Sequence, residues 1–355
     1  MNALDKLQKL VSNDLKTFRF NYFPNSESFL YNGFNHKRGG NFEEKRYKFS
    51  SLDCFNDFIF AGNIGGEKPS DYAKSVHLYN LLFQKEGIKC FAHGFDVNPV
   101  FGTDNRPTKD QCNFENFLDE VVKNSMQFLL LHVTDPYKLN AYEYALKNNI
   151  SMSESARISG VVNPFLFDKK GKLYSENVDG YALMEAIENK MKVDGKTILL
   201  IGAGGAASSI ALEAVNRLGD GKIIIANRTQ ERAHELSEKL KSYKNLNDDK
   251  IISGGVELIS QNKNIDVIIS AITENPYITE SIANSIPKNT LFVDINYGDR
   301  AVVASIGKRT GHDAIDGTPM VYYGVKRTAE LAFEKKLGKH IKESTFDFIK
   351  KEAGL

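Results

Sequence analysis

Short apolar runs alternate with longer segments of helical spacing along most of this chain. Strands that alternate with helices are typical of parallel sheets covered by helices, so the sequence predicts an α/β fold. The predicted strands and extended segments cover residues 57–62, 90–97, 128–133, 172–177, 197–201, 222–226, 266–270 and 291–295. The predicted helices cover residues 75–86, 114–124, 179–192, 208–218 and 320–349.

The beginning of the chain follows a different pattern. Leucine and valine recur at helical spacing from Leu4 to Leu15, which predicts an amphipathic helix over residues 1–15. Residues 18–49 are rich in Phe, Tyr, Asn and Gly and have no clean period. Three roles are open for this segment: packing over the core, acting as a lid, or forming an oligomer contact.

Composition and charge limit the classes of partner that the protein is expected to bind. The chain has 46 Lys and Arg against 45 Asp and Glu, so a net charge of +1 gives no long-range attraction to nucleic acid or anionic membranes. The three cysteines have no metal-ligand or disulfide spacing, and the first residues do not form a signal peptide. We therefore expect a soluble, cytoplasmic protein without a bound metal.

One turn carries a strong cofactor signal. The aliphatic run over residues 197–201 leads into a small-residue turn and then into a helix. The first glycine allows a tight turn, the second allows backbone to approach a pyrophosphate, and the small third residue allows helix and strand to pack closely. The predicted dinucleotide-binding residues are Gly202, Ala203, Gly204, Gly205, Ala206 and Ala207.

The next strand indicates which dinucleotide binds. It ends in Asn227-Arg228-Thr229, where an NAD enzyme usually has an acid for the ribose 2′-hydroxyl. The guanidinium of Arg228 matches a 2′-phosphate in charge and geometry, and Arg232 follows one helical turn later. The sequence therefore favours NADP over NAD.

Two polar residues upstream form a candidate proton-transfer pair. Oxidation of a secondary alcohol needs a group that takes the hydroxyl proton, and a lysine oriented by a carboxylate meets that need. Lys138 follows an apolar strand and a Thr-x-Pro turn, and Asp179 begins a helix. Taken singly, Lys138 is typical of a surface lysine and Asp179 of a helix N-cap.

From about Phe58 to the C-terminus the chain resembles the shikimate dehydrogenase family. The resemblance rests on motifs in the family's order: residues 133–138, 161–164, 177–180, the glycine turn, Asn-Arg-Thr, Asp294-x-x-Tyr297 and Asp316-Gly317-x-x-Met320. It implies that Lys138 and Asp179 are the catalytic pair. It also implies substrate contacts from Ser75, Thr134, Asn163 and Tyr297, and further cofactor contacts from Ile295 and Gly317.

The resemblance also implies a domain organisation. Residues 1–56 would be an N-terminal extension, and residues 57–180 with the C-terminal helices 318–355 would form the substrate-binding catalytic domain. Residues 181–317 would form the NADP-binding Rossmann domain. The expected partner is a small hydroxylated cyclic carboxylate, and the expected assembly is a monomer or a homodimer.

Departures from the family's motifs leave the substrate open. Ala73 stands where the family has the first of two serines that hold the substrate carboxylate, His132 stands for an asparagine, and Gly324 aligns with a substrate-binding glutamine. The candidates are thus an NADP-dependent dehydrogenase for shikimate, quinate or a related acid, a paralogue with another substrate, or a nucleotide-binding sensor. Glutamyl-tRNA reductases share the glycine turn and Asn-Arg-Thr, but they need a nucleophilic cysteine, and no cysteine here has a supporting context.

Overall fold

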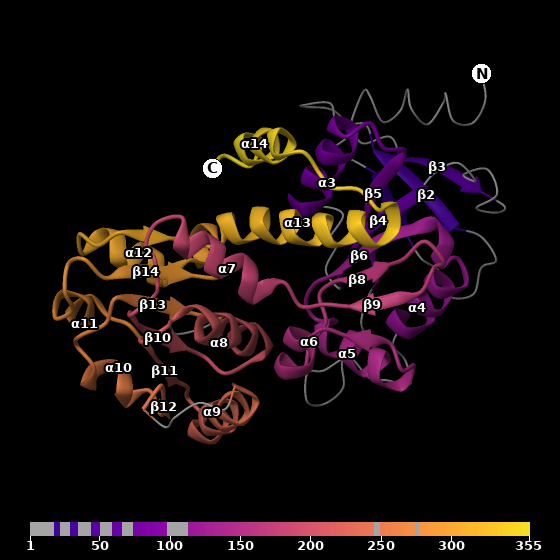
Figure 1. Cartoon of the computed structure of the whole chain (residues 1–355). Helices are drawn as coiled ribbons and strands as arrows, with labels where there is room; N and C mark the ends of the chain where they lie inside the picture. The colour runs from indigo at the N-terminus through magenta and orange to yellow at the C-terminus, as the bar shows by residue number, and fades with distance from the viewer. Residues whose placement is uncertain are drawn as a thin grey trace. The chain divides into compact units, whose positions relative to one another are not determined.

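The computed structural model describes the backbone over residues 18–21, 29–34, 44–49, 59–65, 74–97, 113–244, 249–273 and 277–355. Side chains are described from Ile59 onward, apart from Asp96 and Asn113. The helix expected over residues 1–15 lies outside these ranges. The chain forms two compact units (Figure 1). Unit 1 comprises Met1–Ser153, Val161–Glu176 and Thr328–Leu355, and unit 2 comprises Glu154–Gly160 and Asn177–Arg327.

Unit 2 is built on a six-stranded sheet in which every neighbouring pair is parallel. Its strands are β10 (Thr197–Ile201), β11 (Lys222–Ala226), β12 (Ile251–Gly254), β13 (Val267–Ser270), β14 (Leu291–Asp294) and β15 (Ala314–Ile315). The spatial order is β12-β11-β10-β13-β14-β15, so the direction of chain progression reverses between β10 and β13. Open α/β sheets bind ligands at such a switch point, beyond the carboxyl ends of the strands.

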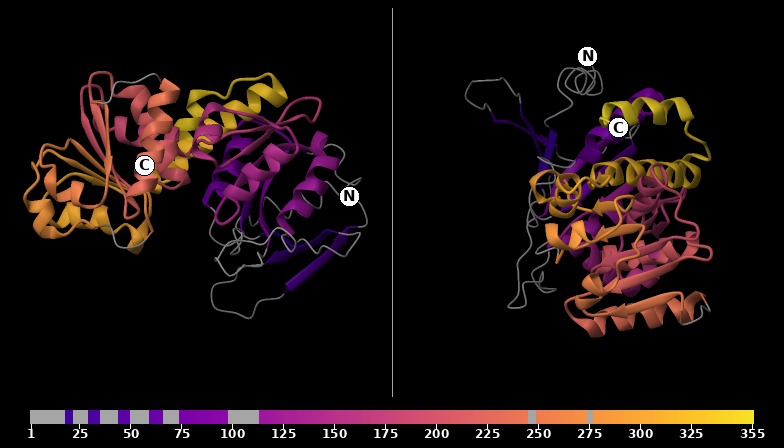
Figure 2. Two further views of the ribbon diagram at one scale, coloured as in Figure 1. Left: turned by 90° about the horizontal axis from the view of Figure 1, so that it is seen from below. Right: turned by 90° about the vertical axis from the view of Figure 1, so that its left-hand side faces the viewer.

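Alternate residues of the unit 2 strands face two different cores. Ile198 and Leu200 of β10 pack with the first group of helices, whereas Leu199 and Ile201 pack with the second. The first group is α7 (Asp179–Glu188), α8 (Gly205–Arg217) and α9 (Gln230–Lys244), and the second is α10 (Glu257–Gln261), α11 (Glu280–Asn284) and α12 (Val302–Arg309). Helices therefore cover both faces of this sheet, as two further views show (Figure 2), and the α/β fold class is confirmed.

Unit 1 contains a nine-stranded sheet of mixed direction, ordered β3-β2-β1-β5-β4-β6-β8-β9-β7. Its strands are β1 (Phe18–Asn21), β2 (Phe29–Phe34), β3 (Glu44–Phe49), β4 (Ile59–Gly65), β5 (Cys90–Asp96), β6 (Phe128–Val133), β7 (Ser151–Met152), β8 (Phe165–Phe167) and β9 (Leu173–Ser175). The central pairs β1·β5, β5·β4 and β4·β6 are parallel, while β1·β2, β2·β3, β6·β8 and β8·β9 are antiparallel. The sequence predicted parallel pairing alone and gave no strands within residues 18–49.

The remaining helices differ from the predicted pattern at the C-terminus and over residues 138–147 and 154–159, where no helix was predicted. Unit 1 carries α3 (Lys74–Lys85), α4 (Asn113–Lys123), α5 (Lys138–Lys147) and α14 (Glu343–Glu352), and α6 (Glu154–Ser159) belongs to unit 2. The predicted helix over residues 320–349 is instead α13 (Thr318–Ala332), a π-helical stretch η5 (Phe333–Leu337) and α14. Gly338 ends η5 in the left-handed conformation, with φ of 62°, because a residue without Cβ adopts it at little cost.

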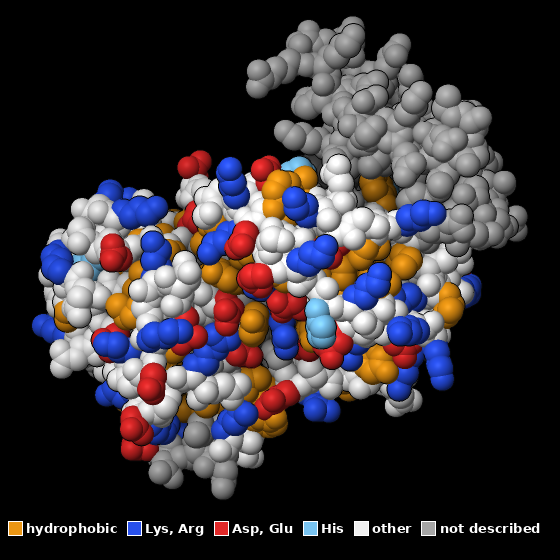
Figure 3. All heavy atoms as spheres, turned by 45° about the horizontal axis from the view of Figure 1, so that its top comes forward, with side chains coloured by type: hydrophobic (Ala, Val, Ile, Leu, Met, Phe, Trp, Pro, Cys, Tyr) orange, Lys and Arg blue, Asp and Glu red, His pale blue; other side chains and the backbone are white. Residues whose placement is uncertain are grey.

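Charged side chains of both signs intermingle on the face drawn in Figure 3. This mixing fits the near balance of acidic and basic residues in the sequence. Among the described residues, no helix combines the length and the apolar character needed to cross a membrane.

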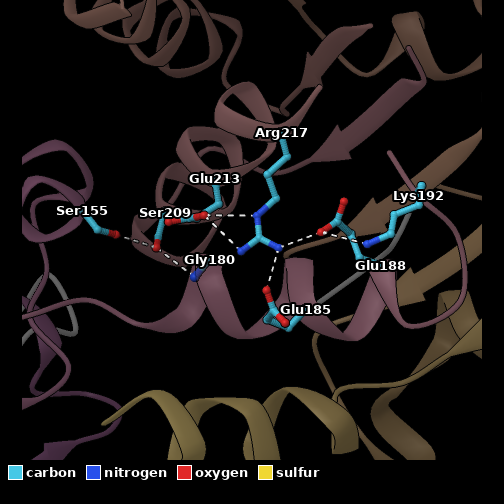
Figure 4. A network of polar contacts seen from close by, with 8 residues as sticks. All are labelled: Ser155, Gly180, Glu185, Glu188, Lys192, Ser209, Glu213 and Arg217. Carbon is cyan, nitrogen blue, oxygen red and sulfur yellow. Dashed lines mark hydrogen bonds and ion pairs between the residues drawn. The ribbon is translucent and has the colours of Figure 1, made fainter. Parts of the chain in front are cut away.

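The close approach of α7 to α8 depends on a missing side chain. A Cβ placed on Gly180 would lie 2.1 Å from the backbone oxygen of Ser209, nearer than real Cβ atoms come. The Gly180 N–H donates to Ser209 Oγ over 2.9 Å, and Ser155 Oγ lies 3.1 Å from the same hydroxyl (Figure 4). This packing places Asp179 and Gly180 in unit 2, although the sequence assigned them to the substrate-binding domain.

The contact predicts that Gly180→Ala lowers the free energy of unfolding by about 1–3 kcal/mol, the usual cost of overpacking. Denaturant unfolding followed by circular dichroism measures the change. Gly324→Ala is the matched control, because the one described atom that a Cβ there meets within 4 Å is the Ala182 Cβ at 3.9 Å. In a helix interior this control gains roughly 0.5–1 kcal/mol. Equal stability of the two variants would contradict the packing argument.

Candidate active site and dinucleotide turn

The turn after β10 has the geometry that a pyrophosphate needs. Gly202 has φ of 121°, and a Cβ on it would lie 3.0 Å from the Ala271 oxygen, so glycine is required by the fold itself. A Cβ on Gly204, in contrast, meets no atom of the described residues within 4 Å. Helix α8 begins at Gly205, earlier than the predicted residue 208, and Gly204 caps it without a side-chain hydrogen bond. The helix N-terminus is thus open to an anion beside a glycine with empty space above it.

The small third position of the turn lies in the core. Ala207 is fully buried among the residues that join α8 to the strands. This contact explains why the helix follows the strand so closely. The open space at Gly204 and the uncapped start of α8 together fit a dinucleotide phosphate.

Other predicted cofactor residues follow neighbouring strands at the same sheet edge. Asn227, Arg228, Thr229 and Arg232 come after β11, where the Asn227 carboxamide donates to the Thr229 oxygen over 2.8 Å and both arginines are exposed. Ile295 and Gly317 come after β14 and β15, and a Cβ on Gly317 would lie 2.1 Å from the Ile295 oxygen.

Asp294, the first residue of the Asp294-x-x-Tyr297 motif, is buried and has a structural role. Burial raises the pKa of its carboxyl above the ordinary value, and the hydrogen bonds that it accepts offset part of that shift. The donors are the Asn296 N–H at 3.0 Å, the Asn296 carboxamide at 2.9 Å and the Val303 N–H at 2.9 Å. Asp294 therefore fixes the loop that carries Tyr297, a predicted substrate residue placed in unit 2.

Asp179 is buried at the first residue of α7, one position later than the N-cap that the sequence indicated. Its N–H donates to Asn177 Oδ1 over 3.0 Å, and Asn177 Nδ2 donates to Ser159 Oγ over 2.8 Å. With the Gly180–Ser209 contact, these bonds fix Asp179 beside the first turns of α8.

An ion-pair network fastens the rest of α7 to α8 (Figure 4). Arg217 of α8 lies 2.9 Å from Glu185 and 3.0 Å from Glu188 of α7, and 3.4 Å from Glu213 of its own helix. These carboxylates raise the pKa of the Arg217 guanidinium against the opposing effect of burial, which is the largest single influence. The cation therefore bridges the two helices in its charged form.

In unit 1 the predicted substrate residues gather at the carboxyl ends of β4 and β6. Thr134 follows β6, and its hydroxyl donates to the Ile64 oxygen over 3.0 Å and faces Asn63 Oδ1 at 3.4 Å. Ser75 lies in the first turn of α3, where its Oγ accepts from Asn63 Nδ2 over 2.8 Å. Asn63 joins these two hydroxyls and was not among the residues predicted from the sequence.

Lys138 and Asn163 lie on adjoining segments of the same unit. Lys138 is partly buried at the start of α5, and its oxygen accepts from the Val162 N–H over 3.0 Å. Asn163 follows directly, is 2% exposed, and donates its N–H to the Glu176 oxygen over 2.7 Å. Unit 1 thus brings together Ser75, Thr134, Lys138 and Asn163, whereas Asp179 and Tyr297 belong to unit 2.

His132 is buried beneath α3. Its Nδ1 lies 3.2 Å from the hydroxyl of Tyr79, a wholly buried residue of that helix. Burial raises the pKa of the Tyr79 phenol above its ordinary value, which keeps the hydroxyl neutral. Of the other substituted positions, Gly324 lies within α13 and Ala73 is outside the described residues.

The fold and the site define the class of protein: a two-unit α/β protein with a glycine turn that fits a dinucleotide phosphate at the switch point of one sheet and a polar cluster at the strand ends of the other. A family model described as "Shikimate / quinate 5-dehydrogenase" matches residues 184–315. A curated relative, the "Shikimate dehydrogenase (NADP(+))" of Cupriavidus necator, is 30% identical over 210 residues, which cover 56% of this chain and 67% of the relative. The chain belongs to the shikimate dehydrogenase family.

Two further comparisons agree with this assignment. The enzyme of the same name from Methanosarcina barkeri is 29% identical over 266 residues, 72% of this chain and 86% of the relative. A crystal structure of a shikimate dehydrogenase in complex with NADP+ has a TM-score of 0.65 at 23% identity, covering 83% of this chain and 96% of that chain. At that identity the structural likeness establishes the fold alone.

Gly202 and Gly204 of the turn are expected to respond differently to substitution. Gly202→Ala should lower the thermal unfolding temperature, because φ of 121° is strained for a residue with Cβ. Gly204→Val should leave that temperature nearly unchanged, since its φ of −85° suits any residue, yet weaken dinucleotide binding by about 10-fold or more by blocking the phosphate. Calorimetric titration and thermal scans separate the effects, and full affinity in a folded Gly204→Val variant would rule out a phosphate at this turn.

Proposed function

We propose that this chain is an NADP-dependent dehydrogenase that interconverts a secondary alcohol and a ketone on a hydroxylated cyclic carboxylate, such as shikimate and 3-dehydroshikimate or quinate. Its membership of the family supports this proposal, since the relatives from Cupriavidus necator and Methanosarcina barkeri are named "Shikimate dehydrogenase (NADP(+))". The single observation that carries it is the fastening of Asp179 to α8, the helix that begins at the dinucleotide turn.

The cofactor half of the proposal rests on charge and space. Gly204 and the uncapped start of α8 would receive the pyrophosphate, and Arg228 with Arg232 would receive the 2′-phosphate. When bound, NADP+ would accept a hydride from the carbinol carbon, and NADPH would supply one to the carbonyl carbon of the ketone. The guanidinium groups of both arginines are exposed. Residues 227–229, directly after the strand, include no acid, whereas a carboxylate at this strand end would favour NAD.

The proton half of the proposal assigns roles to Lys138 and Asp179. Lys138 takes the substrate hydroxyl proton in the oxidative direction and returns it in the reductive direction, and Asp179 orients the lysine. They belong to different units of the fold, so their assignment as one pair rests on the family's motifs. Ser75, Thr134, Asn163 and Tyr297 are proposed to hold the substrate.

The direct test of this function is a panel of shikimate, quinate and related cyclic acids with NADP, and of 3-dehydroshikimate with NADPH, followed at the NADPH absorbance. We expect turnover of at least one member. Failure of every member would favour the paralogue or sensor alternatives. Binding of the same acids by calorimetry would then separate those two, because a sensor that retains only the cofactor turn has no need of the substrate.

Lys138→Ala is expected to lower kcat by about 10²–10⁴-fold, the usual contribution of general acid–base catalysis, and to leave NADPH affinity nearly unchanged. Steady-state kinetics and cofactor titration measure the two quantities. Lys147→Ala is the matched control: this exposed lysine ends the same helix, pairs with Glu115 over 3.0 Å and should have no effect on kcat. A Lys138→Ala enzyme with the normal rate would disprove the proton-relay role.

Arg228→Asp is expected to shift the preference from NADP toward NAD by about 10-fold or more in kcat/KM, because a carboxylate repels a 2′-phosphate and accepts from a ribose hydroxyl. Lys263→Asp makes the same charge change at another exposed position of unit 2 and should preserve the NADP preference. If both variants keep the original preference, Arg228 does not bind the phosphate.

A further inference from the structure

Asn63 is a buried polar residue to which the proposed mechanism gives no role. It lies near the carboxyl end of β4 and is 2% exposed, and a buried carboxamide has to find hydrogen-bond partners. Its partners are two side chains already proposed to hold the substrate. Nδ2 lies 2.8 Å from Ser75 Oγ, and Oδ1 lies 3.4 Å from Thr134 Oγ1.

The hydrogen bonds fix which of the two hydroxyls donates and which accepts. Ser75 Oγ accepts from Asn63 Nδ2, and among the described residues no group accepts the Ser75 hydroxyl proton. Thr134 Oγ1 donates its proton toward two acceptors, the Ile64 oxygen at 3.0 Å and Asn63 Oδ1. A hydroxyl has one proton to donate and two lone pairs, so Ser75 is left to donate to a ligand and Thr134 to accept from one.

The helix that carries Ser75 is held against the strand ends at a second point. Asn63 and His132 are direct partners in the β4·β6 register, so their side chains leave the same face of the sheet. Ser75 and Tyr79 are four residues apart and share one face of α3. The Asn63–Ser75 bond and the 3.2 Å contact between Tyr79 and His132 therefore fasten α3 to both strands.

We propose that Asn63 is a positioning residue that sets the hydrogen-bond polarity of the substrate site, directing the Ser75 proton to a carboxylate and the Thr134 lone pairs to a substrate hydroxyl. The inference rests on the proposed function and adds a residue that determines specificity. It explains how Ser75 alone can bind a carboxylate where Ala73 replaces the first of the family's two serines. A ligand is selected when it presents an anionic acceptor and a hydroxyl donor at the spacing of these two residues.

The test is Asn63→Leu, which keeps the side-chain shape and removes both polar atoms. The KM for the cyclic acid should rise on the order of 10- to 100-fold, as for a lost bond to a charged group, while kcat and NADPH affinity stay within about 3-fold. Asn80→Leu is the control: among the described residues, this buried asparagine of α3 bonds the backbone of Ala92 alone, with its Nδ2 3.0 Å from the oxygen and its Oδ1 2.8 Å from the N–H. It should lose stability and keep its KM.

A double-mutant cycle shows whether Asn63 acts through Ser75. In a Ser75→Ala background, Asn63→Leu should change KM by less than about 3-fold, because the Ser75 hydroxyl is gone and Thr134 still donates to the Ile64 oxygen over 3.0 Å. Fully multiplicative effects, an unchanged KM in Asn63→Leu, or an equal rise in Asn80→Leu would each overturn the assignment. If Asn63→Leu does not fold, Asn63→Asp serves instead, since a carboxylate can only accept and would capture the Ser75 proton; an unchanged KM there also overturns it.

This outcome is separable from failure of the proposed function. If the wild-type chain turns over an acid and Asn63→Leu has the same KM, only the positioning role is lost. If the wild-type chain turns over none of the panel, the proposed function is lost. Calorimetric titration of the same acids onto wild type and Asn63→Leu then decides the role of Asn63, and equal affinities or absence of binding overturn it.

Discussion

The contact between Gly180 and Ser209 is the constraint on which the proposed chemistry of unit 2 depends. A backbone oxygen of one helix occupies the place where the other helix would have its first side-chain carbon. This approach brings the start of α7 against the second turn of α8, whose first turn begins within the glycine turn proposed to bind the dinucleotide. The buried carboxylate of Asp179 is therefore held by backbone geometry, and the Arg217 network secures the two helices further along.

Unit 1 positions its polar groups by a different means. There the carboxamide of Asn63 fills the space between a helix and two strand ends, and buried side-chain bonds take the place of close backbone contact. A carboxamide is directional because its nitrogen donates and its oxygen accepts. The helix contact in unit 2 thus fixes the position of Asp179. Asn63 in unit 1 fixes both the positions of Ser75 and Thr134 and the direction of their hydrogen bonds.

The sequence predicts the parts of this molecule whose signal is local. The strand, turn and helix from Thr197 onward were predictable because the role of each small residue in the turn depends on its immediate neighbours in the sequence. The buried strands 128–133 and 197–201 were predicted with the bounds that the structure has. Asn63 was missed because its importance comes from residues 12 and 71 positions away. Short antiparallel strands such as β8 were missed because three residues carry no readable period.

The chain passes from unit 2 to unit 1 and back again between residues 154 and 177. Helix α6 belongs to unit 2 but lies in the sequence between two segments of unit 1. Four contacts hold it within unit 2. Ser155 lies 3.1 Å from Ser209, Asn177 bonds to Ser159, Lys244 pairs with Glu154 over 3.2 Å, and the ammonium of Lys239 donates to the Ile158 oxygen.

Asn163 follows this helix by a few residues, and Asn177 begins the return to unit 2. The segment that carries a proposed substrate residue is therefore anchored at both ends in the unit that carries the cofactor turn. Ser209 serves both anchors, because its hydroxyl contacts Ser155 before the segment and Gly180 after it. A substitution at Ser209 would loosen both ends of the segment at once, although neither the substrate nor the cofactor need touch that residue.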